Sequence, residues 1–442
     1  MKKIIIIFLT VVLIMSALSL NNFALEDVQP QYSDYCAVYN IENSKSCYSL
    51  RADDRIAPAG TVKIMTACIA IGYYEGKYDT PITIEGSWLT EVTGLTAGFS
   101  AGETVTAEKI ISSLIVGNGN DSAYILAHAI AGSKAAFVEM MNAKAKELGM
   151  GDTLYTNPAG TDEEGMYTSV NDVIKISCYA YTLAKYIELS DSPSVSIDAT
   201  NKSNSRRLYN RNFFVSNYYN TRYLNSSVMG LNSGSSGKAG TCLSVIGRSD
   251  SGLTYIVVTM GGRDPEPEEG KEPDKFFVGG YEDAALLLNW AYDNFGYFTI
   301  LDTSTMVCEV PVKLSNKVDH VILLPEEKLV SFLPLDTDID NVVRKEWTLK
   351  SPTLKAPLSQ GEVVGELTVY VEDEVAGKVN LIARNNVDRS NWLLMLDTLG
   401  SIITHPISII LFVIVLLFIV VYVFFTAKRL ARKRQIVKYR KR

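Results

Sequence analysis

The sequence has little of the chemistry that binds metal ions. Its 442 residues include only three histidines and six cysteines, and no two cysteines have the Cys-x-x-Cys spacing typical of zinc sites. It also lacks internal repeats and low-complexity tracts. Charged residues make up 21% of the chain and hydrophobic residues 47%, a balance that argues against long disordered segments. We therefore expect a globular protein with no metal site and no cofactor.

Charge is absent from residues 407–425, an apolar run near the C-terminus. At ~1.5 Å per residue this run can cross a bilayer core of ~30 Å. We predict a transmembrane helix at residues 406–426, and a buried core helix is the weaker alternative. Nine lysines and arginines follow within residues 427–442. Positive residues stay on the cytoplasmic side, which predicts a single-pass cell-membrane protein with a cytoplasmic basic tail and an extracytoplasmic body. A nucleic-acid-binding tail is the competing interpretation.

The N-terminus has the pattern of a secretory signal. Two lysines precede an apolar run at residues 4–20, and small or polar residues follow up to Ala24. These are the charged and apolar regions of a signal peptide, which we predict at residues 1–24. An uncleaved N-terminal anchor is the alternative, because Phe23 makes the cleavage site imperfect.

The region between these ends is strongly acidic. The chain has 42 basic residues, of which two lie at the N-terminus and nine in the tail, so 31 remain against 49 acidic residues, a formal charge of −18. Such a surface does not suit nucleic acid or anionic lipid. We expect no nucleic-acid partner.

Periodicity divides this region into two domains. Residues 35–50 alternate as a hairpin, and residues 242–247 and 253–260 read as adjacent strands. Helical patterns occupy residues 62–74, 106–116, 121–131, 134–148, 171–183 and 283–292. From residue 306 the pattern changes to short alternating segments. We predict an α+β domain at residues 33–297, a small β-rich domain at 302–385 and a linker at 386–405.

Two cysteines flank the turn of the predicted hairpin. An exported protein can form disulfides, so Cys36 and Cys47 either form one or are small buried apolar residues.

Short phrases then occur in a fixed order along the first domain. They are Ala57-Pro58-Ala59-Gly60-Thr61-Val62-Lys63, Ala101-Gly102-Glu103, Gly119-Asn120-Asp121-Ser122-Ala123, Phe137-Val138-Glu139-Met140-Met141-Asn142, Asn157-Pro158-Ala159-Gly160, Asn210-Arg211-Asn212 and Ala239-Gly240-Thr241. Together they resemble the D-alanyl-D-alanine carboxypeptidases, which are serine peptidases and low-molecular-mass penicillin-binding proteins. The resemblance extends to Ala356-Pro357 and Gly361-Glu362-Val363 near the C-terminus. It implies a β-lactamase/transpeptidase-like α/β/α layer domain, a β-rich second domain and a role at cell-wall peptidoglycan.

The first motif of that family is Ser-x-x-Lys. Three helical steps bring the two residues to one face, where the lysine amine can take the serine proton. The matching positions here are Gly60 and Lys63. Gly60 has no side chain and cannot attack a carbonyl. Because glycine is accepted at a helix N-cap, we expect the helix to begin here without the hydroxyl.

The two other motifs also depart from the family. Ser-x-Asn matches Asn118-Gly119-Asn120, which keeps the amide and loses the hydroxyl that relays protons. Lys-Thr-Gly holds the terminal carboxylate of the substrate and matches Asn232-Ser233-Gly234, where the cation is lost. A charge-assisted hydrogen bond is about twice as strong as a neutral one, so we expect substrate binding at these residues to be weakened.

Two hydroxyls are candidates for a substitute nucleophile. Thr61 lies two positions from Lys63, nearly opposite on a helix, and no base is obviously placed for Ser233. A nucleophile needs its base within hydrogen-bond reach, so we expect neither to serve.

Three functions remain. The first is a pseudoenzyme that binds a D-Ala-D-Ala-like peptidoglycan stem peptide or a cell-envelope protein. The second is an active serine-type carboxypeptidase with an unorthodox nucleophile, and the third is a structural ectodomain with a vestigial cleft. We favour the first, because Lys63, Asn120 and Ser233 are retained.

Overall fold

The computed structural model describes residues 28–267 and 272–439. They form two compact units. The first holds the residues up to Gly296 together with Phe332–Asp336, and the second holds Tyr297–Ser331 and the residues from Thr337 onwards. The predicted signal peptide at residues 1–24 lies outside the described residues, as do residues 440–442 of the basic tail.

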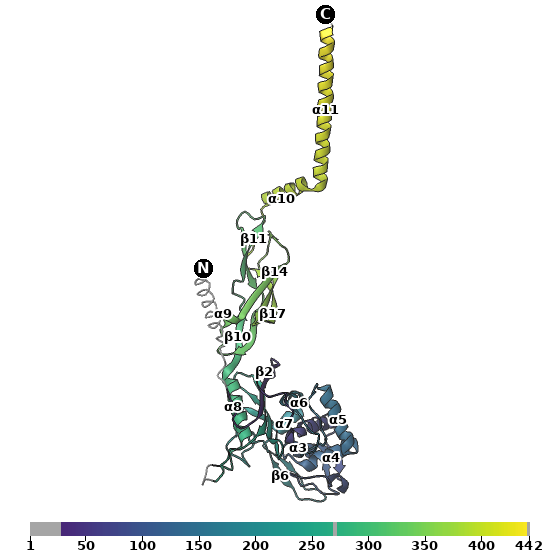
Figure 1. The fold of residues 1–442 in the computed structure, drawn as a ribbon, viewed down its shortest axis with the longest axis vertical. Coiled ribbons are helices and arrows are strands. Elements are labelled where there is room, and N and C mark those ends of the chain that lie inside the picture. The colour runs from purple at the N-terminus through teal and green to yellow at the C-terminus, as the bar shows by residue number, and fades with distance from the viewer. Residues whose placement is uncertain (1–27, 268–271, 440–442) are drawn as a thin grey trace, which may run out of the picture. The chain divides into compact units, whose positions relative to one another are not determined.

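A five-stranded antiparallel sheet forms the centre of the first unit (Figure 1). Its strand order is β2-β1-β9-β8-β7, with β1 at Tyr35–Asn40, β2 at Lys45–Leu50, β7 at Val228–Ser236, β8 at Gly240–Arg248 and β9 at Thr254–Gly262. The predicted hairpin is β1 and β2, and the two strands predicted as adjacent are β8 and β9. β7 ends the sheet, so within the described residues its outer edge pairs with no strand.

Helices cover both faces of this sheet. One face carries α2 (Val62–Tyr74), α3 (Ala107–Ile115), α4 (Asn120–Ala131), α5 (Lys134–Glu147), α6 (Val170–Thr182) and α7 (Ala184–Ser190), and the other carries α8 (Gly279–Asn294). Strand β9 shows the reason, because successive side chains point to opposite faces. Ile256 and Val258 join the core of the first helix group, whereas Tyr255 and Val257 pack in the core with α8. The predicted α/β/α layer domain is confirmed.

The second unit is β-rich, as predicted. Its six-stranded sheet has the order β14-β16-β17-β12-β11-β15. The strands are β11 (Cys308–Lys313), β12 (His320–Pro325), β14 (Val343–Leu349), β15 (Leu354–Lys355), β16 (Val363–Val371) and β17 (Glu374–Ala383), with the short helix α9 (Ile339–Val342) before β14.

Several short elements were not predicted. They are the strand pairs β3 (Pro81–Thr83) with β4 (Thr104–Thr106), β5 (Ser194–Ile197) with β6 (Arg206–Tyr209) and β10 (Phe295–Leu301) with β13 (Leu329–Pro334), and the 3₁₀ turns η1 (Ala59–Thr61) and η2 (Gly86–Leu89). Most have only three or four residues, too few to show a period.

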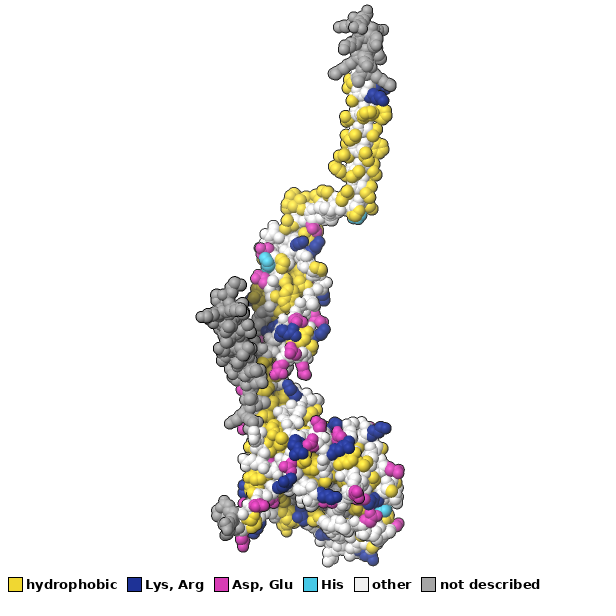
Figure 2. Space-filling model, viewed as in Figure 1, with side chains coloured by type: hydrophobic (Ala, Val, Ile, Leu, Met, Phe, Trp, Pro, Cys, Tyr) yellow, Lys and Arg dark blue, Asp and Glu magenta, His cyan; other side chains and the backbone are white. Residues whose placement is uncertain are grey.

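Two helices end the chain. α10 (Asn391–Thr404) occupies much of the stretch predicted as a linker, and α11 (Pro406–Tyr439) follows it. Residues Pro406–Leu430 of α11 are long and apolar enough to cross a membrane. Their hydrophobic side chains are exposed along the helix (yellow in Figure 2). This is consistent with a membrane anchor.

The six cysteines are free thiols, so the disulfide considered for Cys36 and Cys47 does not form. Across the hairpin Cys36 lies opposite Leu50, and the register shift between Val38 and Tyr39 leaves Cys47 opposite no residue. The two cysteines therefore do not face each other, although they flank the same turn.

Candidate functional site

Several separate segments line one cavity of about 670 Å³ in the first unit, and three of them carry the motif positions. Gly60 and Lys63 come from η1 and α2, Asn118 from the connection between α3 and α4, Asn120 from the start of α4, and Ser233-Gly234 from β7. The three motif positions named by the resemblance therefore meet at one place.

Asn232 does not line this cavity. Its side chain is only 3% exposed, and its Oδ1 is buried without a hydrogen-bond donor among the described residues. It precedes Ser233 on β7, and adjacent side chains of a strand point to opposite faces. The position that matches the lysine of Lys-Thr-Gly thus offers no side chain to a bound molecule.

Gly60 lies in the 3₁₀ turn η1, directly before α2. The expected N-cap role is therefore wrong, since Pro58 caps η1 and Thr61 caps α2. The backbone of Gly60 packs against β7. A Cβ atom built on it would lie 2.8 Å from the Cα of Gly234 and 3.0 Å from the carbonyl oxygen of Ser233. The position that matches the serine nucleophile lacks both the side chain and the space for one.

Lys63 is buried, with 4% of its surface exposed. Its amine donates a hydrogen bond to the carbonyl oxygen of Ala159 at 2.7 Å, and no carboxylate pairs with it in the described part of the chain. Burial lowers the pKa of this amine to about 7, because charging it costs hydration that no partner replaces. Near neutral pH a large fraction of it is an uncharged base.

Neither candidate hydroxyl is hydrogen-bonded to this base. The Oγ1 of Thr61 donates to the carbonyl oxygen of Pro58 at 2.6 Å, and the Oγ of Ser233 donates to that of Arg211 at 3.1 Å. Thr61 is also buried and does not line the cavity. The described residues therefore contain no paired nucleophile and base at this site.

The two asparagines bond to other parts of the cavity wall. Asn118 has a φ of +56°, in the left-handed region that asparagine tolerates. Its Nδ2 donates to the carbonyl oxygen of Ser233 at 2.8 Å, while the Nδ2 of Asn120 donates to that of Thr93 at 2.6 Å. The first bond joins the α3–α4 connection to β7, so both amides stabilise the wall that they form.

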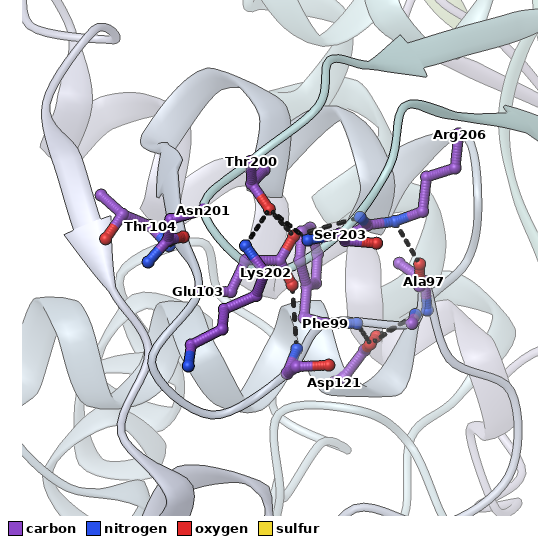
Figure 3. Close-up of polar contacts among 12 residues, drawn as sticks. Ala97, Phe99, Glu103, Thr104, Asp121, Thr200, Asn201, Lys202, Ser203 and Arg206 are labelled. Carbon is purple, nitrogen blue, oxygen red and sulfur yellow. Dashed lines mark hydrogen bonds and ion pairs between the residues drawn. The ribbon is translucent and has the colours of Figure 1, made fainter.

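Two buried carboxylates, Asp121 and Glu103, bond to the loop that follows Thr93 (Figure 3). Asp121 accepts hydrogen bonds from the backbone N–H groups of residues 97–99 at 2.8 to 3.1 Å. Glu103 is fully buried and forms an ion pair with Arg206 at 3.1 Å, and the Nε of Arg206 donates to the carbonyl oxygen of Ala97. These bonds fix the loop between Thr93 and β4, whose Thr93 carbonyl oxygen accepts from Asn120, and so they help to place Asn120.

Among the cavity-lining polar side chains that sequence reasoning did not single out are Asp162, Arg211, Asp264 and Tyr281. Asp162 accepts from the Oγ of Ser236 at 2.6 Å, and Asp264 accepts from the backbone N–H of Gly279 at 2.9 Å. Only Arg211 had a signal in the sequence, since the phrase Asn210-Arg211-Asn212 belongs to the resemblance. The others come from loops or from α8, and only folding brings them to the cavity.

Comparison with known proteins places this cavity in a wider context. Residues 30–264 match the family model of D-alanyl-D-alanine carboxypeptidase, and residues 295–389 match that of the penicillin-binding protein 5 C-terminal domain. The D-alanyl-D-alanine carboxypeptidase DacF of Bacillus subtilis is 25% identical over 364 residues, which cover 81% of this chain and 87% of the relative. DacA of Haemophilus influenzae is 25% identical over 405 residues, 86% of this chain and 94% of the relative.

Solved structures show the same fold. Penicillin-binding protein 5 of Haemophilus influenzae aligns with a TM-score of 0.56 at 22% identity, over 82% of this chain and all of that one. Penicillin-binding protein 6B of Escherichia coli aligns with a TM-score of 0.59 at 20% identity, over 81% of this chain and 98% of that one.

The contact between Gly60 and β7 predicts opposite effects for two glycine substitutions. Gly60→Ala should lower the free energy of unfolding by about 1–3 kcal/mol, because the added methyl group must displace backbone atoms. Gly72→Ala is the matched control in α2, where no atom lies within 4 Å of the added Cβ. It should stabilise the protein by about 0.5–1 kcal/mol, since alanine favours helix. Urea unfolding followed by circular dichroism measures both. Equal stabilisation by the two changes would contradict the close contact.

The lowered pKa of Lys63 predicts a pH-dependent stability. Below about pH 7 the amine is charged in both states, and the cost of charging it in the buried site is fully present. Between pH 7 and the ordinary pKa of lysine, the unfolded chain carries one more proton than the folded chain. The free energy of unfolding therefore rises by about 1.4 kcal/mol per pH unit in this range. Lys63→Met removes this cost. It should be more stable than the native chain at pH 6, and the difference should shrink steadily towards pH 9.

Exposed Lys146, on α5, supplies the control for this measurement. Lys146→Met should give a difference from the native chain that does not change with pH. A pH-independent effect of Lys63→Met would mean that the buried amine keeps an ordinary pKa.

Proposed function

Because this chain belongs to the D-alanyl-D-alanine carboxypeptidase family of peptidoglycan metabolism, we propose that it binds peptidoglycan stem peptides without hydrolysing them. One observation carries this proposal. The position of the nucleophile is a glycine whose backbone packs against Gly234, so the cavity has neither the attacking oxygen nor room for it. The chemistry of the family needs that oxygen to form an acyl-enzyme.

The remaining parts of the cavity suit binding. β7 ends the sheet, and its residues from Ser233 to Ser236 line the cavity. An extended peptide can add to such an edge through backbone hydrogen bonds. Lys63 matches the general base of the family motif. Its amine is hydrogen-bonded to the carbonyl oxygen of Ala159 and to no hydroxyl group of the described residues from which it could take a proton. The site therefore keeps a place for a peptide and lacks the group that would cut it.

This proposal predicts that the protein forms no covalent adduct with a β-lactam. Intact-mass spectrometry after incubation with benzylpenicillin should show the unmodified mass, and a peptide ending in D-Ala-D-Ala should release no D-alanine. An active D-alanyl-D-alanine carboxypeptidase serves as the positive control. Gly60→Ser should also fail to form the adduct, because its Cβ meets the backbone of β7 before Oγ can be positioned.

Three outcomes separate the competing functions. An adduct mapped to Ser233 or Thr61 would establish an active enzyme with an unorthodox nucleophile. If there is no adduct, a rise in melting temperature with the same peptide supports the binding function, since a ligand that binds only the folded state stabilises it. If no adduct forms and the melting temperature does not rise, the remaining function is that of a structural ectodomain with a vestigial cleft.

We also propose that the body lies outside the cytoplasm, with residues 406–426 crossing the membrane and the basic tail inside. The long apolar helix at Pro406–Leu430 supports this topology, together with the lysines and arginines that follow it. Protease added to intact cells should remove the body and leave an epitope at the C-terminus protected. Permeabilised cells are the control, in which the epitope should be lost. A body protected in intact cells would reverse the topology.

A further inference from the structure

Arg211 stands at the cavity beside the retained hydroxyl of β7. Its carbonyl oxygen accepts hydrogen bonds from the Oγ of Ser233 at 3.1 Å and from the hydroxyl of Tyr281 at 3.3 Å. Burial raises the pKa of Tyr281 to about 12, so its hydroxyl remains a donor. The backbone of Arg211 is thus fixed next to the position that matches the threonine of Lys-Thr-Gly.

The side chain of Arg211 is held in place without being neutralised. Its guanidinium carbon lies 3.7 Å from the ring centroid of Tyr219, a distance at which the ring stabilises the cation. No carboxylate forms an ion pair with it in the described ranges, and its Nε is buried without an acceptor there. Burying an unpaired donor costs free energy, so this guanidinium is suited to an anion brought by a ligand.

The other charged groups of the cavity do not compete for this role. Lys63 has a pKa of about 7 and bonds to Ala159. Asp162 and Asp264 are acceptors engaged by Ser236 and Gly279. Among the cavity-lining residues of the described chain, Arg211 is therefore the one permanently charged cation.

We propose that Arg211 binds the terminal carboxylate of the peptide, in place of the cation that is missing at Asn232. This inference rests on the proposed peptide-binding function and names the residue that recognises the end of the peptide. A planar guanidinium holds a carboxylate through two parallel hydrogen bonds, and the fixed neighbour Ser233 lines the same part of the cavity. The ligand class is a peptide with a free C-terminal carboxylate.

A pair of synthetic peptides tests the role of the carboxylate. Diacetyl-Lys-D-Ala-D-Ala and its C-terminal carboxamide differ only in charge and in one acceptor, and their Kd values are measured by titration of the full-length protein in nanodiscs. The native chain should bind the acid roughly tenfold to a hundredfold more tightly than the amide, because charge-assisted bonds are the stronger ones. Arg211→Gln should bind both peptides equally, at the affinity of the amide. Arg211→Lys should retain part of the preference, since it keeps the charge and loses the planar fork.

The matched control is Arg207→Gln on β6, where the arginine is exposed. It should keep the full preference for the acid. Melting temperatures of all variants establish that they are folded, and the comparison of the two peptides on the native chain needs no variant.

Each outcome decides one of the two proposals. Equal binding of acid and amide by the native chain would overturn the role of Arg211 and leave peptide binding intact. A preference for the acid that survives in folded Arg211→Gln would have the same consequence. If the native chain bound neither peptide, the proposed function itself would fail, and the inference with it.

Discussion

The contact between the backbones of Gly60 and Gly234 is the constraint on which the rest of this site depends. It joins the turn at the start of α2 to the edge strand β7, and so connects the helical layer to the sheet at the cavity. Side chains on either residue would force the two segments apart, because backbone atoms on both sides fill the space. A serine at position 60 would need room there for its side chain and hydroxyl. Here the close approach uses that room for packing.

Polar groups around the junction bond to the protein itself. The amine of Lys63 and the amides of Asn118 and Asn120 each donate to a backbone carbonyl oxygen at 2.6 to 2.8 Å. Buried donors need such partners, and these bonds stabilise the wall more than they prepare it for proton transfer. Asp121 bonds to the backbone of the loop that follows Thr93, and Glu103 pairs with Arg206, which bonds to the same loop at Ala97. These bonds fix the shape of the cavity, and the position that matches the family's serine is a glycine, Gly60.

Much of the fold follows from local pattern. Periods of 3.6 and 2 identified the main helices of the first unit, the β1–β2 hairpin and the strands β8 and β9, because one face of each element must be buried. The short strands β3 to β6 and the pair β10–β13 were not predicted, since their pairing depends on partners distant in the sequence. The hairpin was predicted correctly, but the sequence does not specify its register. Whether Cys36 and Cys47 form a disulfide therefore could not be decided from the sequence. The register shift between Val38 and Tyr39 shows that the two cysteines do not face each other.

The sequence by itself determined the family, the loss of the serine hydroxyl at Gly60 and the long apolar segment at the C-terminus, because these depend only on which residues occur in which order. Tertiary structure alone decided the rest of the site. It buried Asn232 away from the cavity, brought Arg211 next to Ser233 and pressed Gly60 against β7. The physical reason is that burial, desolvation and close contact are properties of segments that meet only after folding. A residue's identity gives its chemistry, and the neighbours that folding supplies decide whether that chemistry is available.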